Sequence, residues 1–339
     1  MKLKEILEIC YGKNQREVEV DFSSIPILGT GGIIGYASRP LYDGESVLIG
    51  RKGTIGMPFY INKPFWTIDT LFYTKINKSI VLPKYLYYCL MTIGLERYSE
   101  GAAVPSLTTK TLYDIEIDVP SMEIQQHIVN TIGTIDELIE KKEEEFKSKI
   151  RLLSLLFDKY ESGKNVSFGE AFITFNGGTF QSKFYVPYST NKLITIKNVD
   201  DSGFNTDSVS YISDDKADKK YLLNMGDIVL TMTGNIGRTG IVDEDNCFLN
   251  QRVLKLDCSS KSYLLGYLLK YKNDIIQLGK GTAQLNLSLE DLKQLQVHNS
   301  KEEIMFFKKY DSIFSSLLNC KLVIKKAKDL KANLLIKYF

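Results

Sequence analysis

Two long stretches, half a chain apart, carry apolar residues in steps of mostly three and four, which is the spacing of one face of an α-helix. The first runs from Met122 to Tyr160 and has its apolar residues at Ile124, Ile128, Ile132, Ile135, Ile139, Phe146, Ile150, Leu153, Phe157 and Tyr160. The second runs from Lys301 to Phe339, with Ile304, Phe307, Phe314, Leu318, Ile324, Leu330, Leu334 and Tyr338. Polar residues fill the other faces, so the pattern predicts two long amphipathic helices.

A helix of nearly forty residues is roughly 55–60 Å long at about 1.5 Å per residue, longer than one small domain can cover. The economical partner for its apolar stripe is the other helix, in an antiparallel coiled coil that relates two halves of the chain by a pseudo-twofold axis. Two separate helices, each capping its own domain, are the alternative. The charged stretch EKKEEEFKSK favours a solvated spacer. Ser121 is the predicted N-cap of the first helix.

The remaining segments are strand-like, because β-branched and aromatic runs alternate with Gly, Pro, Asn and Asp. Examples are SVLIG, FWTIDTLFYTKI and DIEIDVP in the first half, and KLITIKNV, DIVLTM and RVLKLD in the second. We therefore predict an α/β (α+β) protein with two strand-rich domains, joined by two long helices. The predicted boundaries are 1–120 for domain 1, 121–161 for the central helix, 162–300 for domain 2 and 301–339 for the C-terminal helix.

The strand-rich segments of the first half are repeated in the second half of the sequence. GTIGMPFYINKPFWTIDTLFYTKI aligns with GNIGRTGIVDEDNCFLNQRVLKLD at a shift of 181 residues, which places Gly53 over Gly234 and Gly56 over Gly237. Upstream, GESVLIG aligns with GDIVLTM at a shift of 182, and downstream GAAVPSLTTKTLYDIEIDVP aligns with GTAQLNLSLEDLKQLQVHNS at a shift of 180. Three blocks in the same order at nearly one period indicate an internal duplication.

Composition narrows the class of protein. The five scattered cysteines form no C-x-x-C pair, and the two histidines have no metal ligands at suitable spacing, so reduced thiols and no metal site are expected. No apolar run is long enough for a membrane span, and Glu5 and Glu8 stand where a signal peptide would be apolar, so we expect a cytoplasmic protein. The net charge of +2 does not itself indicate nucleic-acid binding, although a partner chain can carry the positive charge of a complex.

Motifs for catalysis are missing from the sequence. It contains no G-x-x-x-x-G-K-[ST] loop, and GTGGIIG does not complete a G-x-G-x-x-G motif in front of a helix. No proline is followed by another, so the Asn/Asp-Pro-Pro-aromatic loop of amino-methyltransferases is absent as well. We therefore predict a chain that is not an enzyme.

The repeated segments, taken together with the two helices, carry a family resemblance. GTGGIIGY, GESVLIGRKGTIG, PFWTIDTLFY and GAAVPSLTTKTLYDIEIDVPSMEIQQHIVNTIGTIDELI resemble the specificity (S) subunit of type I restriction-modification systems, and GDIVLTMTGNIG, FLNQRV and GTAQLNLSLEDL fit the same pattern in the second copy. The resemblance covers nearly the whole chain. The second copy departs from it, since it has SKEE in place of PSMEIQQ and lacks an Arg-Lys pair in TMTGNIG.

The resemblance implies a subunit with two target-recognition domains, each reading one half of a bipartite site in double-stranded DNA. Two methyltransferase subunits would dock on the helices and supply S-adenosylmethionine chemistry, and a restriction/translocase subunit would use ATP and Mg²⁺. No cofactor is then expected on this chain. Because the two copies differ in the segments that would touch bases, we expect two unlike half-sites. A stand-alone DNA-binding or decoy protein and a coiled-coil scaffold that does not bind DNA remain as alternatives.

The candidate DNA contacts lie in the repeated glycine-rich loops. In GRKGTIG, at residues 50–56, glycines would allow close approach of a DNA phosphate to the donors Arg51, Lys52 and Thr54. The repeat partner offers Thr233, Asn235 and Arg238. The residue types that commonly read base edges follow at Asn250, Gln251 and Arg252, although strand alternation would turn half of them inward. Alternatively, the glycines serve a tight hairpin and the cations are solvated. Trp66 is predicted to lie in the core.

Overall fold

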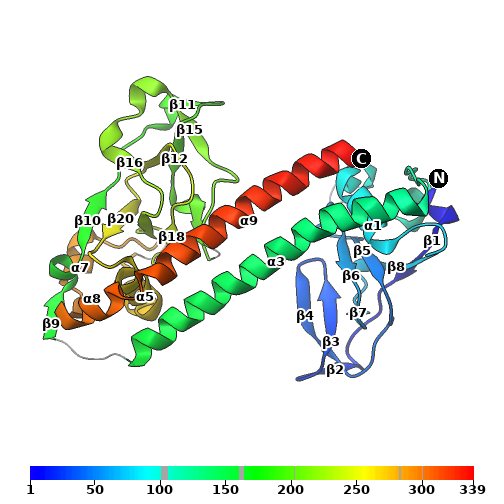
Figure 1. Ribbon diagram of the computed structural model, residues 1–339, viewed down its shortest axis with the longest axis horizontal. Coiled ribbons are helices and arrows are strands. Elements are labelled where there is room, and N and C mark those ends of the chain that lie inside the picture. Colours follow the sequence, from blue (N-terminus) through cyan, green and yellow to red (C-terminus); the bar gives the residue numbers. More distant parts are fainter. Residues whose placement is uncertain (101–105, 160–163, 202, 282–283, 300) are drawn as a thin grey trace. The chain divides into compact units, whose positions relative to one another are not determined.

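The structure, a computed structural model, describes residues 1–100, 106–159, 164–201, 203–281, 284–299 and 301–339 (Figure 1). It forms two compact units. Unit 1 comprises Met1–Leu138 and Ala327–Phe339, and unit 2 comprises Ile139–Lys326. The chain passes from unit 1 to unit 2 within helix α3 (Met122–Lys159) and returns within helix α9 (Asp311–Tyr338). In the described part of the chain, no helix is both long and apolar enough to cross a membrane.

Unit 1 contains two four-stranded sheets. The first is antiparallel with the order β1-β8-β5-β6, where β1 is Leu7–Tyr11, β8 is Leu71–Ile76, β5 is Ser46–Gly50 and β6 is Phe59–Ile61. The second has the order β2-β4-β3-β7, where β2 is Glu19–Val20, β4 is Gly32–Ala37, β3 is Ile25–Gly29 and β7 is Trp66–Thr67. The helical segments are η1 (Leu3–Glu5), α1 (Pro83–Thr92), η2 (Leu95–Tyr98) and α2 (Thr109–Tyr113).

Unit 2 has a matching pair of sheets. The first has the order β10-β20-β17-β18, where β10 is Ile173–Asn176, β20 is Val253–Asp257, β17 is Ile228–Thr231 and β18 is Thr239–Ile241. The second has the order β11-β15-β12-β19-β16, where β11 is Tyr185–Val186, β15 is Ser210–Ile212, β12 is Lys192–Ile194, β19 is Cys247–Leu249 and β16 is Leu222–Leu223.

Smaller elements complete unit 2. Two further strand pairs are β13 (Val199–Asp200) with β14 (Gly203–Phe204), and β21 (Gln296–Asn299) with β9 (Lys164–Ser167). The α-helices are α4 (Phe168–Ala171), α5 (Lys261–Lys270), α6 (Lys272–Gln277), α7 (Leu289–Gln294) and α8 (Lys301–Lys308). The 3-10 turns are η3 (Ser182–Phe184), η4 (Ile196–Asn198), η5 (Asp214–Lys216) and η6 (Lys219–Tyr221).

The duplication is visible in the strand connections. In both units the first sheet uses corresponding strands in the same order with antiparallel neighbours. In both units the second sheet contains one parallel pair, β3 with β7 in unit 1 and β12 with β19 in unit 2. The predicted class, two repeated strand-rich domains with two long helices, is therefore confirmed.

Both units bury parts of α3 and α9 together. In unit 1, Ile128 and Ile132 near the start of α3 belong to the core against which Leu334 and Leu335 near the end of α9 pack. In unit 2, residues near the end of α3, including Phe157, share a core with residues near the start of α9. Each unit therefore pairs the two helices antiparallel, and the same helix segments also cover the domain core. Ser121 Oγ accepts a hydrogen bond from Ile124 N at 3.4 Å, which supports its predicted N-cap role.

The predicted helix over 301–339 is instead two helices, α8 and α9, separated by a turn at Lys309 and Tyr310. The turn brings Asp311 to the start of α5, where its carboxylate accepts hydrogen bonds from Ser260 Oγ at 2.8 Å and from Ser262 N at 2.9 Å. The N–H groups of a helix start lack partners within the helix, so this capping explains the break. At the other helix, the predicted end at Tyr160 lies outside the described residues.

Candidate nucleic-acid interface

The loop after β5 holds the predicted phosphate-binding residues of unit 1. Its backbone is fixed by hydrogen bonds from Arg51 N to Thr70 O at 2.8 Å and from Leu107 N to Arg51 O at 3.0 Å. Gly53 adopts a φ of 80°, a left-handed conformation that favours glycine. A Cβ at Gly50 would lie 2.2 Å from the carbonyl oxygen of Thr54. Both glycines are therefore needed for the loop to turn, whatever the loop binds.

Unit 2 repeats this construction with other side chains. Met232 takes the place of Arg51, and its carbonyl accepts a hydrogen bond from Leu287 N at 2.8 Å. Gly234 has a φ of 72°, close to that of its repeat partner. An isolated antiparallel bridge joins Thr233 to Asn286, as another joins Lys52 to Ser106 in unit 1. The backbone of the loop is thus conserved between the repeats, while the residues that it presents differ.

Side chains of the unit 1 loop are partly available to a ligand. The Arg51 guanidinium lies 5.2 Å from the centre of the Tyr11 ring and donates to the carbonyl of Asp69 at 3.2 Å, so it is already held. Lys52 and Thr54 are exposed. Among the described residues the Lys52 ammonium has no ion-pair partner. Lys52 is therefore the cation of this loop that is best placed to meet a phosphate.

Side chains of the unit 2 loop are more engaged. Arg238 Nη2 lies 2.7 Å from Asp201 Oδ2, and Lys272 Nζ lies 3.3 Å from the other oxygen of the same carboxylate. Hydrogen bonds from Arg238 and then from Lys272 hold the pKa of Asp201 below its usual range. When the side-chain oxygen and nitrogen of Asn235 are exchanged, the oxygen faces Arg238 and accepts a hydrogen bond from Arg238 Nη1 at 2.8 Å. Thr233 is only 7% exposed. This loop therefore presents less free positive charge than its counterpart.

The predicted base-reading residues lie at the turn between β19 and β20. Asn250 is only 8% exposed, and its side-chain oxygen accepts from Arg252 N at 3.4 Å, so it shapes the turn. Gln251 and Arg252 are exposed. Gln251 Oε1 accepts from Thr179 Oγ1 at 2.8 Å. The turn thus points one of the three residues inward and leaves the other two accessible for contact with DNA.

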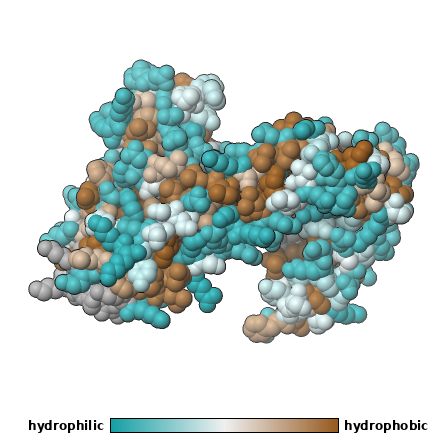
Figure 2. All heavy atoms as spheres, viewed as in Figure 1, coloured by the Kyte–Doolittle hydropathy of each residue, from teal (hydrophilic) through white to brown (hydrophobic). Residues whose placement is uncertain are grey.

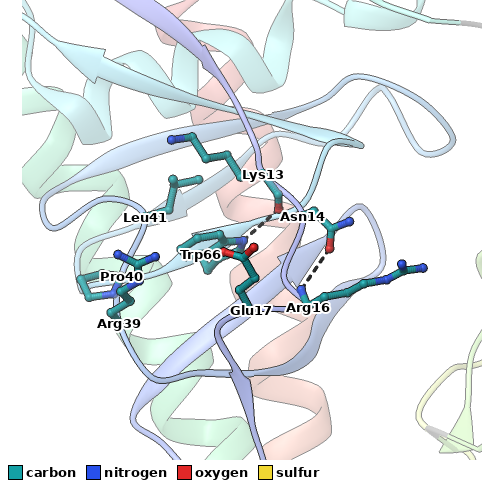
Figure 3. A pocket seen from close by; sticks show the side chains of 8 residues that line it. All are labelled: Lys13, Asn14, Arg16, Glu17, Arg39, Pro40, Leu41 and Trp66. Atoms are coloured by element: carbon teal, nitrogen blue, oxygen red, sulfur yellow. Dashed lines mark hydrogen bonds between the residues drawn. The ribbon is translucent and has the colours of Figure 1, made fainter.

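A cavity of 610 Å³ in unit 1 was not predicted from the sequence (Figure 3). It is lined by Lys13, Asn14, Arg16, Glu17, Arg39, Pro40, Leu41 and Trp66. These residues come from the loop after β1, the loop after β4 and strand β7, to which Trp66 belongs. The available signal was the density of charge in the segment GKNQRE after β1. Trp66 is 7% exposed and its indole N–H donates to the carbonyl of Lys13 at 2.9 Å, which confirms its predicted place in the core.

Comparison with known proteins decides the family. Residues 1–152 and 159–304 each match the family model described as "Type I restriction modification DNA specificity domain". The chain belongs to this family. The two matches together cover most of the chain, and their succession agrees with the duplicated sheets of units 1 and 2. The resemblance that the sequence motifs carry is therefore confirmed.

Individual members of the family are related over different lengths. The MjaIX specificity subunit of Methanocaldococcus jannaschii is 32% identical over 139 residues, which cover 39% of this chain and 32% of that protein. The EcoprrI specificity subunit of Escherichia coli is 28% identical over 114 residues, and the chain spans 28% of its length. The MjaVIII specificity subunit, also of M. jannaschii, is 25% identical over 345 residues, which cover 87% of this chain and 77% of that protein.

A solved structure agrees at the level of fold. The crystal structure of the type I restriction-modification S subunit from M. genitalium covers 100% of this chain and 95% of its own, with a TM-score of 0.66 at 15% identity.

The chemistry of the described residues adds two points about this specificity-domain protein. No three His, Cys, Asp or Glu side chains of the described ranges gather as a metal ion would require. The five cysteines are free thiols, and burial raises the pKa of Cys89 and of Cys247 to about 12. A thiol with such a pKa is a poor nucleophile at neutral pH, so these two cysteines pack the core.

Proposed function

We propose that this chain is the DNA-recognition subunit of a type I restriction-modification complex, reading a bipartite target of two unlike half-sites in double-stranded DNA. One observation carries the proposal. Each unit holds the same glycine loop, bridged to the same following segment, yet the corresponding positions carry the exposed Lys52 in one unit and the buried Thr233 in the other. A repeated backbone that carries different side chains suits two recognition domains that each bind a different half-site.

The loops supply the positioning part of this proposal. We assign contacts with DNA to four exposed side chains: Lys52 and Thr54 of unit 1, and Gln251 and Arg252 of unit 2. Arg51 would contact a phosphate from its place over Tyr11. Asn235 and Arg238 would do so only in competition with Asp201. Thr233 and Asn250 are buried and would act through the shape of their loops.

Exposed apolar residues on the long helices support docking of methyltransferase subunits. On α9, Ile336 is 79% exposed and Leu330 is 51% exposed, and on α3 Ile124, Leu152 and Leu155 are each about half exposed. Figure 2 shows hydrophobic side chains among hydrophilic ones over α9. Exposed apolar surface of this kind commonly marks a protein interface. We assign S-adenosylmethionine, ATP and Mg²⁺ to the partner subunits and none of them to this chain, which we propose is not catalytic.

The test is methylome sequencing of a host without other methyltransferases that expresses this chain with its cognate methyltransferase subunits. The expected result is one bipartite methylated motif with two different halves, absent when this chain is omitted. The same motif without this chain would refute the proposal. A chain that binds DNA with a steep salt dependence but does not copurify with a methyltransferase would instead be a stand-alone binder. A chain without such DNA binding would be a scaffold.

A further inference from the structure

The cavity of unit 1 is held rigid by backbone hydrogen bonds, while its charged side chains are exposed. Lys13 N donates to Thr67 O at 2.8 Å, and the carbonyl of Lys13 accepts from Trp66 Nε1 at 2.9 Å. Arg16 N donates to the side chain of Asn14 at 3.0 Å. On the opposite wall, Leu41 N donates to Phe65 O at 2.8 Å. The loops are therefore fixed before any ligand binds, which lowers the cost of binding.

Four charged side chains line this cavity without pairing to one another. Lys13, Arg16, Glu17 and Arg39 are exposed, and none of them forms an ion pair with a described residue. The surrounding domain is electrically balanced, since positions 1–120 contain 13 basic and 13 acidic residues. Three cations on one cavity are therefore a local concentration of charge in a neutral domain.

The carboxylate of Glu17, among the three cations of the cavity, restricts the class of ligand that can bind there. Figure 3 shows its side chain projecting toward Trp66, with Arg39 on one side and Arg16 on the other. A free anion such as phosphate would be attracted by the cations and repelled by this carboxylate. A DNA groove presents both complements, because its phosphates accept hydrogen bonds and the exocyclic amino groups of cytosine and adenine donate them. The mixed lining therefore fits duplex DNA.

We infer that this cavity is a base-reading site of unit 1, in which Glu17 accepts a hydrogen bond from the exocyclic amino group of a cytosine or adenine. Lys13 and Arg39 bind the flanking phosphates and offset the repulsion between the carboxylate and the DNA backbone. The inference rests on the proposed function and assigns a specificity-determining residue that lies outside the glycine loops.

The segment that corresponds to Lys13–Glu17 in unit 2 carries no charge: the residues after Gly12 are KNQRE, and those after Gly177 are GTFQS. Gly12 follows β1 and Gly177 follows β10, and at each of them a Cβ would lie within 2.2 Å of a backbone oxygen of the facing segment. The next residue is Lys13 in unit 1 and Gly178 in unit 2. Glu17 lies five residues after Gly12, and Ser182 lies five residues after Gly177, so the proposed base contact belongs to unit 1 alone, which is consistent with half-sites of different sequence.

The test compares Glu17→Gln and Glu17→Ala with the wild-type chain, each assembled with the cognate methyltransferase subunits. Methylome sequencing gives the motif, and fluorescence anisotropy gives the affinities for duplexes that differ at one base pair. We expect one position of one half-site to lose discrimination by roughly 5- to 150-fold, the range for one specific base contact. The other half-site should stay unchanged. Affinity for bulk DNA should not fall, because a negative charge has been removed.

Two controls separate base reading from general charge effects. Glu19→Gln removes another exposed carboxylate two residues away, outside the cavity lining, and should leave the motif unchanged. Lys13→Ala and Arg39→Ala should keep the motif, weaken binding alike for all sequences and lower the salt slope by about 0.9 each.

If both Glu17 variants keep the wild-type motif with discrimination within about twofold at every position, the base-reading assignment is overturned while the proposed function stands. A wild-type complex that produces no bipartite motif would overturn the proposed function itself, and this inference with it.

Discussion

Lys52 allows the phosphate-binding role of the glycine loop to be measured with little structural disturbance. Its side chain is exposed and has no ion-pair partner among the described residues, so Lys52→Ala should leave the fold intact. Each phosphate contact contributes about 0.9 to the slope of log K against log salt. Between 50 and 200 mM salt, one contact therefore changes the affinity by roughly three- to fourfold. We expect the variant to lose that much of the salt dependence, equally for all DNA sequences.

Arg51→Ala should add a second loss of similar size, but it also removes the contact with Tyr11 and the hydrogen bond to Asp69, so its thermal stability must be measured alongside. Lys63→Ala is a matched control. Lys63 is an exposed lysine of the same unit, and it follows the strand end at Ile61 that pairs with Ser46, whereas Arg51 follows the other end of β5. The control variant should keep the wild-type slope.

The assay is a salt titration of binding by fluorescence anisotropy, with the assembled complex on specific and non-specific duplexes. A slope for Lys52→Ala that equals the wild-type slope would refute the phosphate contact. So would a methylation motif that changes while the affinity does not, because a phosphate contact carries no sequence information.

Three further outcomes test other parts of the structure. Lys331→Met should destabilise unit 1 by about 1–3 kcal/mol in chemical denaturation, because it removes the ion pair with Asp136 and leaves that carboxylate with the hydrogen bond from Tyr88. Adding Asp136→Asn removes the unpaired charge and should recover part of the lost stability. Glu45→Gln should lower stability at neutral pH but not in acid. A hydrogen bond from Lys78 lowers the pKa of Glu45 below 4.5, so this stabilisation is present above pH 4.5 and lost as the pH falls through the folded-state value. Finally, the purified chain alone should transfer no labelled methyl group to DNA.

Features encoded within a single stretch of sequence were predictable. The apolar spacing predicted α3, and the repeated glycines at Gly53 and Gly234 predicted two loops of one shape, because a left-handed turn needs glycine wherever it occurs. The duplication predicted two repeated strand-rich domains, and the first sheets of both units have corresponding strands in the same order, although that order itself was not predicted.

Features that depend on partners far along the chain were not predictable. The break between α8 and α9 exists because Asp311 caps α5, about fifty residues earlier in the sequence. Arg238 is held by Asp201, which has no special spacing to it. The cavity around Glu17 joins two loops and strand β7, which meet only in the folded unit. In each case the side chain contacts residues that are distant in the sequence, and a local sequence pattern contains no information about such contacts.

The pairing of Arg238 leads to a prediction of opposite sign to that for Lys52. Asp201 holds Arg238 at 2.7 Å and Lys272 at 3.3 Å, and hydrogen bonds from these two cations lower the pKa of its carboxyl. Asp201→Asn removes this charge and frees both cations beside the glycine loop of unit 2. If that loop faces DNA, binding should tighten for all sequences, and the salt slope should steepen by up to about one to two units. Adding Arg238→Ala should bring the slope back toward the wild-type value. A slope unaffected by Asp201→Asn, measured on a complex that still methylates its motif, would show that the unit 2 loop does not approach the DNA backbone, and Asn235 and Arg238 would then have to be removed from the proposed interface.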